Sequence, residues 1–199
     1  WALLRTLNSS NPHDITGYLH GTASFVLLPP SSSSPTQSHE SLYTESGSLP
    51  ANLSPTHSPL QWKKSYIWRL TPTQISVWFV KPVASEPPEA DYLFHGMEFR
   101  QPDDNTRAWE GGKEEGGEGY VSPPVPPPVR KRSLSGVGAE EETVVVMARG
   151  NHLCINDMYR TAYAFRVRVM DGEVVSWASR HVVKGPKKNQ DIVNLYSVA

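Results

Sequence analysis

The sequence is poor in the features that mark several classes of protein. Its 199 residues contain one cysteine, Cys154, so no internal disulfide can form and the chain is not a disulfide-stapled secreted scaffold. No apolar run approaches the roughly 20 residues that a membrane-spanning helix needs. The 19 Lys and Arg residues nearly balance the 20 Asp and Glu residues, which gives no electrostatic reason to expect nucleic acid as a partner. We therefore expect a cytoplasmic protein that neither spans a membrane nor binds nucleic acid.

Motifs for nucleotide binding and patterns for helices are also missing. No glycine-rich phosphate loop of either common type is present, and the glycines of residues 111–119 lie in linker-like sequence. No aromatic-basic RNA-binding motif occurs. No segment sustains the apolar period of 3.6 residues that indicates a helix. ATP, dinucleotide and RNA chemistry are therefore poorly supported.

Proline is abundant, with 18 residues, and its distribution separates structured from linker-like sequence. Proline removes a backbone donor and is kept out of central strands. Segments rich in Ser, Pro, Gly or charge bury too little apolar surface to offset ordering entropy, so we expect them to be disordered surface insertions. These segments are residues 29–40, 50–60, 82–89 and 101–142. The remaining chain is long enough for one core, which predicts a single domain over residues 1–199.

The remaining sequence shows the two-residue period of β-strands. Over residues 158–169, apolar and aromatic side chains alternate with Arg and Ala, which predicts a long strand with one buried and one wet face. Asp171-Gly172 then predicts a tight turn into a strand that carries Trp177 and Val183 on one side. This hairpin is the clearest local structure in the sequence.

Further strands make the whole chain all-β. A second hairpin is predicted over residues 62–70 and 74–80. Other strands are predicted at residues 1–7, 17–28, 41–49, 92–99, 143–150 and 191–198. About eight to ten strands joined by local connections favour an antiparallel up-and-down β-barrel. A two-sheet sandwich is the competing architecture.

Polar side chains on inward faces are the first candidates for a site, since a barrel of this size holds a filled core or one small ligand. Alternation places Glu45 on the face of Tyr43, and His95 on the face of Leu93. A carboxylate that faces an apolar interior needs a partner such as Arg or Tyr, and that pairing could be purely structural. An inward histidine is likewise either a satisfied core residue or a functional group. His181 lies toward its strand end and is predicted at the rim.

The segment His152-Leu153-Cys154-Ile155-Asn156-Asp157-Met158-Tyr159 is the densest in polar and ligating groups. His152, Cys154 and Asp157 could hold a metal, but their spacing lacks the usual spread of ligands. A Cys–His nucleophilic pair is a second interpretation, although side chains two apart on one strand rarely face each other correctly. A polar plug that contacts a ligand, with Asp157 capping the turn, is favoured. No metal is therefore expected.

Two segments are distinctive enough to carry a resemblance to a family. They are the His152–Tyr159 segment and Lys184-Gly185-Pro186-Lys187-Lys188. Weaker matches precede them in order, at residues 21–25, 43–47, 66–68 and 94–96. Together they resemble the uncharacterised family numbered 6314 among the domains of unknown function, from Trp1 to nearly the C-terminus outside the insertions. The resemblance implies a small lipocalin-like (calycin-type) β-barrel and no defined activity. The family usually continues with Asp-Tyr where this chain has Asn189-Gln190.

The leading hypothesis is that the barrel binds a small, largely apolar molecule in its interior. Inward aromatic residues with a few convergent polar groups are typical of small-molecule pockets. The predicted walls are Tyr66, Trp68, Tyr159, Tyr163, Phe165 and Trp177. The predicted polar contacts are Glu45, His95, His152, Cys154, Asp157 and, near the mouth, Lys188.

An enzyme on the same barrel is the second hypothesis. His95 or His152 would act as general base, with Asp157 or Glu45 holding its tautomer. Tyr159 would stabilise developing negative charge. A haem-binding variant, with His95 or His152 as axial ligand, lies between binding protein and enzyme.

An interaction module is the third hypothesis. The proline-rich residues 123–128 could recruit a partner protein. The RKRSLS stretch at residues 130–135 matches what a basic-directed kinase accepts. In this case the barrel would only be a scaffold.

Overall fold

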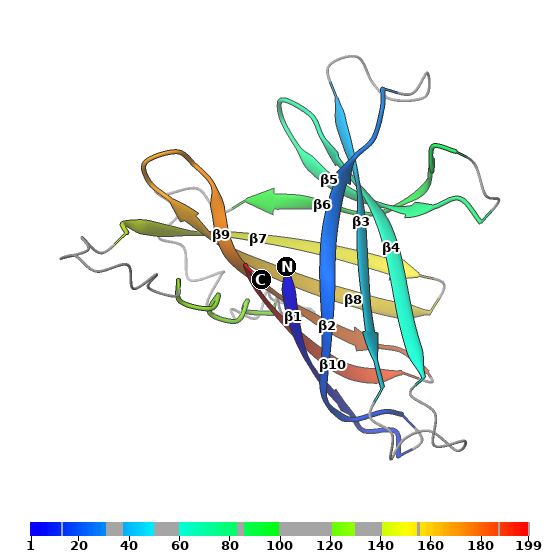
Figure 1. Ribbon diagram of the computed structural model, residues 1–199. Coiled ribbons are helices and arrows are strands. Elements are labelled where there is room, and N and C mark those ends of the chain that lie inside the picture. The colour runs from blue at the N-terminus through cyan, green and yellow to red at the C-terminus, as the bar shows by residue number, and fades with distance from the viewer. Residues whose placement is uncertain are drawn as a thin grey trace, which may run out of the picture.

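The protein is a closed antiparallel β-barrel of ten strands (Figure 1). The computed structural model describes residues 1–12, 14–30, 38–49, 60–82, 86–99, 121–129, 141–154, 156–186 and 188–198. Each strand pairs with its neighbours in sequence, and β1 closes the barrel against β10. The predicted up-and-down barrel is therefore confirmed, and the sandwich alternative is wrong. The described residues contain no helix long and apolar enough to cross a membrane.

The strand bounds follow the alternation in the sequence closely. The strands are β1 (Ala2–Ser9), β2 (Gly17–Leu27), β3 (His39–Ser48), β4 (Gln61–Leu70), β5 (Ile75–Val80), β6 (Ala90–Phe99), β7 (Thr143–Cys154), β8 (Asp157–Arg168), β9 (Val174–Lys184) and β10 (Asn189–Ser197). The largest difference is in β7, which continues through His152 to Cys154. His152 is therefore a strand residue opposite Tyr159, because β7 and β8 pair along their whole length.

One seam of the barrel is much less paired than the others. Among the described residues, β6 and β7 are joined by two residue pairs, Glu98 with Arg149 and Phe99 with Ala148. The Arg149 guanidinium reinforces this contact by donating to the Glu98 carboxylate from Nε at 2.8 Å and Nη2 at 3.0 Å. These two strands are also separated by the longest stretch of chain between successive strands. The first half of β6 is therefore paired with β5 but not, among the described residues, with β7.

A β-bulge in β6 changes which side chains face inward. Val77 of β5 pairs with His95, but the next residue, Trp78, pairs with Leu93, so Phe94 is the extra residue. Phe94 and His95 are consequently both buried, and Leu93 is 44% exposed. The prediction that Leu93 shares the inward face of His95 is wrong, because a bulge reverses the alternation of everything before it.

The interior is filled mainly by aromatic side chains. The Trp177 and Tyr196 rings stack with centroids 3.5 Å apart and an interplanar angle of 2°. Trp68 meets Trp177 edge-on, with centroids 5.9 Å apart. The buried core cluster contains Leu3, Ala23, Tyr43, Trp68, Val77, Phe94, Met97, Ala148, Tyr163, Trp177 and Tyr196. Such rings come from strands far apart in sequence, so the core forms only when the barrel closes.

The outer face of β8 and β9 is covered by residues 121–129. Pro126 in this stretch is fully buried. Arg166 donates hydrogen bonds to the carbonyl oxygens of Pro126 and Pro127, both at 3.2 Å. The Ser176 hydroxyl donates to the Pro127 carbonyl at 2.5 Å. Proline-rich backbone has no internal hydrogen bonds, so its carbonyls are free to accept.

This covering corrects two expectations. The second face of β8 is not wet in its middle, since Ala162 and Ala164 are at most 2% exposed. Residues 121–129 are also not a loose part of the 101–142 insertion, since they pack on the barrel. The contacts with β8 and β9 therefore occupy one face of the proline-rich tract that was considered for partner binding. The RKRSLS stretch lies outside the described residues.

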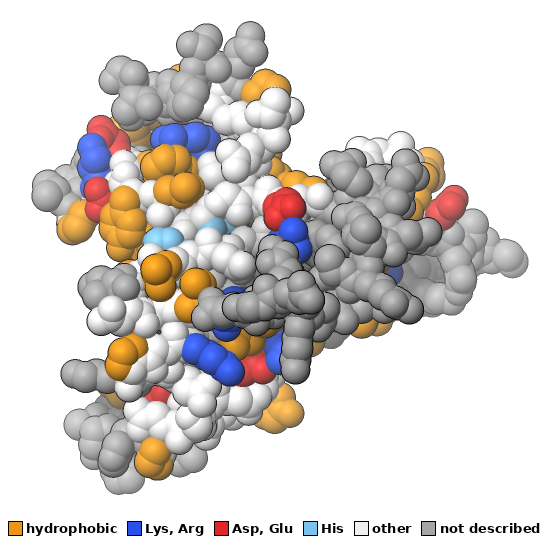
Figure 2. All heavy atoms as spheres, turned by 180° about the vertical axis from the view of Figure 1, so that it is seen from behind, with side chains coloured by type: hydrophobic (Ala, Val, Ile, Leu, Met, Phe, Trp, Pro, Cys, Tyr) orange, Lys and Arg blue, Asp and Glu red, His pale blue; other side chains and the backbone are white. Residues whose placement is uncertain are grey.

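The described surface shows no continuous hydrophobic patch on the face in Figure 2. Hydrophobic side chains there form separate spots among polar ones. Scattered apolar side chains are normal for a soluble surface, whereas binding faces present larger contiguous patches. This visible face therefore adds no support to the interaction-module hypothesis.

Candidate functional site

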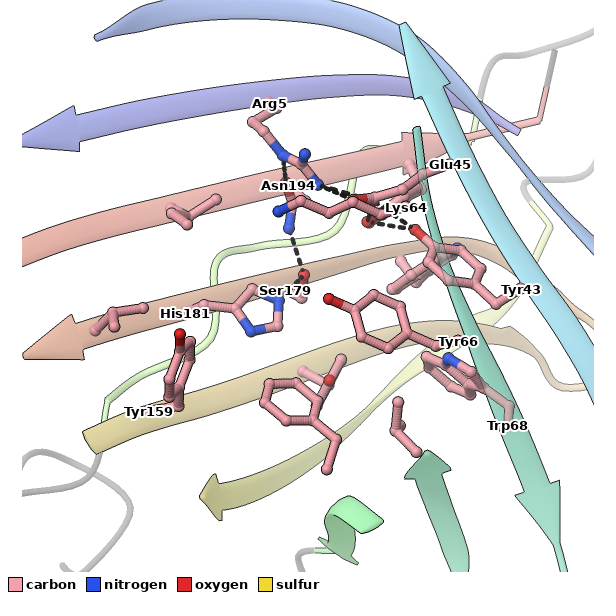
Figure 3. A pocket seen from close by; sticks show the side chains of 17 residues that line it. Arg5, Tyr43, Glu45, Lys64, Tyr66, Trp68, Tyr159, Ser179, His181 and Asn194 are labelled. Carbon is pink, nitrogen blue, oxygen red and sulfur yellow. Dashed lines mark hydrogen bonds and ion pairs between the residues drawn. The ribbon is translucent and has the colours of Figure 1, made fainter. Parts of the chain in front are cut away.

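A cavity of about 100 Å³ lies inside the barrel and is partly open to solvent. Nine of its seventeen lining residues carry a charged, imidazole, hydroxyl or amide group on β1, β3, β4, β9 or β10. The aromatic walls come mainly from β4, β8 and β9 (Figure 3). The lining residues are Arg5, Tyr43, Glu45, Lys64, Tyr66, Trp68, Val77, Phe94, Tyr159, Tyr163, Trp177, Ser179, His181, Val183, Ile192, Asn194 and Tyr196. Polar groups gather at one side, and aromatic rings form the rest.

A buried ion pair between Arg5 and Glu45 is the centre of the polar side. The Arg5 Nη2 donates to both carboxylate oxygens of Glu45, at 2.7 and 2.8 Å. The residues are 6% and 3% exposed. Tyr43 donates its hydroxyl proton to Glu45 Oε2 at 2.9 Å. The expectation that an inward Glu45 needs an Arg or Tyr partner is confirmed, since it has both.

A chain of hydrogen bonds extends from Arg5 across three more strands. Arg5 Nε donates to Asn194 Oδ1 at 2.7 Å, and Asn194 Nδ2 donates to Ser179 Oγ at 3.0 Å. The ring nitrogens of His181 lie 3.1 Å from Ser179 Oγ and 3.1 Å from Thr161 Oγ1. Burial, with smaller contributions from nearby positive charges, lowers the pKa of His181 to about 3. His181 is therefore a neutral member of the cavity lining, and the prediction that it lies at the rim is wrong.

The Arg5 guanidinium also stacks on an aromatic ring, and two glycines make that possible. Its Cζ lies 4.7 Å from the centroid of the Trp62 ring. Gly21 and Gly47 pair across β2 and β3 directly beside this ring. A Cβ on Gly47 would come 2.7 Å from Trp62 Cζ2 and would collide with the backbone oxygen of His20. The absence of side chains here lets Trp62 cover Arg5.

His95 lies behind the cavity wall as a satisfied core histidine. A carbonyl can only accept, so Nδ1 carries the proton toward the Gly96 oxygen at 3.2 Å. Nε2 therefore accepts from the Tyr163 hydroxyl at 3.0 Å. Burial lowers the pKa of His95 to about 4, opposed by its bond to Gly96. Gly150 packs against it, since a Cβ there would lie 2.5 Å from Nδ1.

The neutral state of His95 predicts a pH dependence of stability. Its folded pKa of about 4 lies below the unfolded value of about 6.5, so the unfolded chain binds more protons between these values. Stability is then fully present above pH 6.5 and falls as the pH drops toward 4, by up to about 3 kcal/mol for this residue. Urea unfolding of His95→Gln should give a shallower fall than wild type over this range. Parallel profiles would show that His95 does not supply the dependence.

A second polar cluster lies where the two distinctive sequence segments meet. Lys188 Nζ is 2.8 Å from Asp157 Oδ2 and donates to the Tyr159 hydroxyl at 3.1 Å. Gly185 packs so closely on Asp157 that a Cβ would collide with Oδ1. The His152 ring lies 6.1 Å from that of Tyr159, and its buried Nε2 has no hydrogen-bond partner among the described residues. The distinctive residues thus hold the β7–β8 turn against the end of β9.

Comparison with known families agrees with this arrangement. A family model described as a family of unknown function, DUF6314, matches residues 1–112 and 131–198. The chain belongs to the DUF6314 family. No curated protein and no solved structure matches. Membership in this family of unknown function leaves the activity of the DUF6314 barrel to be argued from its site.

The structure brings only some of the predicted site residues to the cavity of the DUF6314 barrel. Those in its lining are Glu45, Tyr66, Trp68, Tyr159, Tyr163 and Trp177. Phe165, His95, His152, Cys154, Asp157 and Lys188 are outside the lining. Phe165 instead stacks behind Trp177, with centroids 6.1 Å apart. The predicted polar contacts were chosen for their chemistry, and most of them lie behind the wall or at the β7–β8 turn.

Sequence reasoning missed Arg5, Lys64, Ser179, Asn194 and Tyr196. Alternation contains the signal for each of them. Arg5 stands in phase with Leu3 on β1, and Lys64 stands in phase with Tyr66 on β4. If the alternation had been continued through these two charged residues, it would have placed both in the cavity lining.

The catalytic hypothesis gains no support from the described part of this DUF6314 barrel. Its histidines form no hydrogen bond to a carboxylate there, so no base with an orienting acid is assembled. The described residues also hold no group of three or more His, Cys, Asp or Glu placed to bind a metal.

Proposed function

We propose that this DUF6314 barrel binds a small, largely apolar molecule in its interior cavity. The observation that carries the proposal is a cavity whose aromatic walls adjoin an internally satisfied polar cluster. Binding pockets are typically apolar spaces in which a few fixed polar groups orient the ligand. Here the rings of Tyr66, Trp68 and Tyr159 supply the walls, and Ser179 and Asn194 supply donors and acceptors.

The size of the cavity limits the ligand. An apolar cavity of roughly 150 Å³ accommodates benzene, and the cavity here measures about 100 Å³. A ligand with one ring or a short alkyl chain would therefore fill it and project through its open side. Arg5, Glu45, Tyr43, Asn194 and Ser179 of the polar side are each held by a hydrogen bond to a neighbour on another strand. A preorganised site of this kind loses little entropy on binding.

Blocking the cavity should abolish binding of a matched apolar probe. We use 3-phenylpropanol as probe and replace Ile192, a lining residue on β10, with Trp. The larger ring would fill the cavity, so Ile192→Trp should weaken binding at least about tenfold by isothermal calorimetry. Val193→Trp adds the same group to the opposite face of β10 and should leave the affinity near that of wild type.

Both variants should be checked for the barrel by circular dichroism and urea unfolding. Equal affinity of wild type and Ile192→Trp would place the probe elsewhere, and no binding by wild type would contradict the proposal.

A further inference from the structure

We propose that the ligand carries a single carboxylate and that Lys64 is its charge partner. This inference rests on the proposed function, since it names the class of molecule that the cavity takes. Lys64 lies on the inward face of β4 with Tyr66 and Trp68 and lines the cavity. Its side chain reaches toward Asn194 and Glu45 in the polar side of the cavity (Figure 3).

The charges that line the cavity do not cancel. The Arg5 guanidinium is neutralised by Glu45, which it contacts through both carboxylate oxygens. Outside the lining, Lys188 is likewise neutralised by Asp157. Lys64 forms no hydrogen bond and no ion pair within the described part of the chain. One positive charge is thus left over in the lining.

The other titratable groups of the lining are neutral at pH 7. Burial lowers the pKa of His181 to about 3, so its ring carries no charge. Burial also raises the pKa of Tyr66 to about 12. It raises the pKa of Tyr43, Tyr163 and Tyr196 as well. The net charge of the empty site is therefore that of the Lys64 ammonium.

The surroundings make an anion at Lys64 favourable. Lys64 keeps part of its surface in solvent and lies opposite Glu45 across β3 and β4. Partial burial, the larger effect, and the positive Arg5 lower its pKa, and Glu45 opposes them. An anionic ligand in the cavity would give this ammonium an acceptor and offset its repulsion from Arg5. A charge-assisted hydrogen bond of this type is stronger than one between neutral groups.

A carboxylate fits this site better than a phosphate. A phosphate carries about two negative charges at neutral pH, whereas the lining offers one uncompensated cation. Arg5 does not supply a second uncompensated charge, because Glu45 already neutralises its guanidinium. The aromatic walls then take the apolar body of the acid, such as an aryl ring on a short chain.

The test compares two probes that differ in charge, 3-phenylpropanoate and 3-phenylpropanol. At pH 7, wild-type protein should bind the acid about tenfold more tightly than the alcohol by isothermal calorimetry. Lys64→Met should remove this preference by bringing the affinity for the acid down to that for the alcohol. Lys64→Arg keeps the charge and should keep the preference. Lys63→Met removes a lysine from the exposed face of the same strand and should behave as wild type.

The outcomes separate the two proposals. If wild type binds the alcohol but prefers the acid by less than twofold, the charge assignment is overturned and the proposed function stands. If neither probe binds, the proposed function itself is overturned. If Lys64→Met still prefers the acid, Lys64 is not the partner. Urea unfolding of each variant confirms that a lost preference does not come from a lost fold.

Discussion

Replacing Arg5 with Met is expected to lower the free energy of unfolding by about 3–5 kcal/mol, because it leaves a buried charge without its partner. Glu45 is 3% exposed, so water cannot replace the two hydrogen bonds from Nη2. Asn194 Oδ1 also loses its donor. Urea unfolding at pH 7, with linear extrapolation to water, measures the loss.

The double variant Arg5→Met/Glu45→Leu distinguishes the cost of the orphaned charge from loss of packing. Removing both charges takes away the unpaired carboxylate, so the double variant should be more stable than Arg5→Met alone. Lys63→Met, on the exposed face of β4, should change stability by less than about 0.5 kcal/mol. A loss below about 1 kcal/mol for Arg5→Met would mean that the ion pair does not hold β1 to β3.

Replacing Trp177 with Ala should cost a similar amount, about 3–5 kcal/mol, through the cavity that it leaves. Trp177 is 3% exposed at the centre of the aromatic core. Its ring stacks on Tyr196 and meets Trp68 edge-on. The closed barrel cannot collapse into the space, because the surrounding strands are fixed by their backbone ladders. Thermal unfolding followed by near-ultraviolet circular dichroism reports both the stability and the loss of ring packing.

Two comparisons make this result specific. Trp177→Phe keeps an aromatic ring and should cost less than Trp177→Ala, since less volume is lost. Tyr18→Ala removes an aromatic side chain that is 68% exposed and should have little effect. If Trp177→Ala lowered the stability no more than Tyr18→Ala does, the core would not depend on the Trp177 ring.

Glu45 shows how far the sequence could predict the site. Alternation put its carboxylate inside the barrel, and the cost of burying it required a cationic or hydroxyl partner. Both partners are present, as Arg5 and Tyr43. Which arginine it would be was not predictable, because Arg5 is brought to Glu45 only by the pairing of β1 with β2 and β2 with β3.

His95 and Ala162 show where alternation was misleading. The bulge at Phe94 moved Leu93 outward and put two successive residues inside, and nothing in the local sequence marks it. Ala162 was assigned to a wet face, but residues 121–129 cover the outer surface of β8 and β9. That stretch has the composition of a linker, and it packs because its carbonyls meet Arg166 and Ser176.

The sequence by itself determined the all-β class, the order of the strands, the up-and-down barrel and the need to pair Glu45. These follow from the two-residue period and from the cost of a buried charge, which are local properties of the chain. Only the tertiary structure decided which side chains share the cavity, because closure of β1 on β10 joins residues as distant as Arg5 and Asn194. It also decided that Lys64 lines the cavity with no hydrogen-bond partner among the described residues, while His95 is satisfied behind the wall. Hydrogen-bond partners are set by packing across strands.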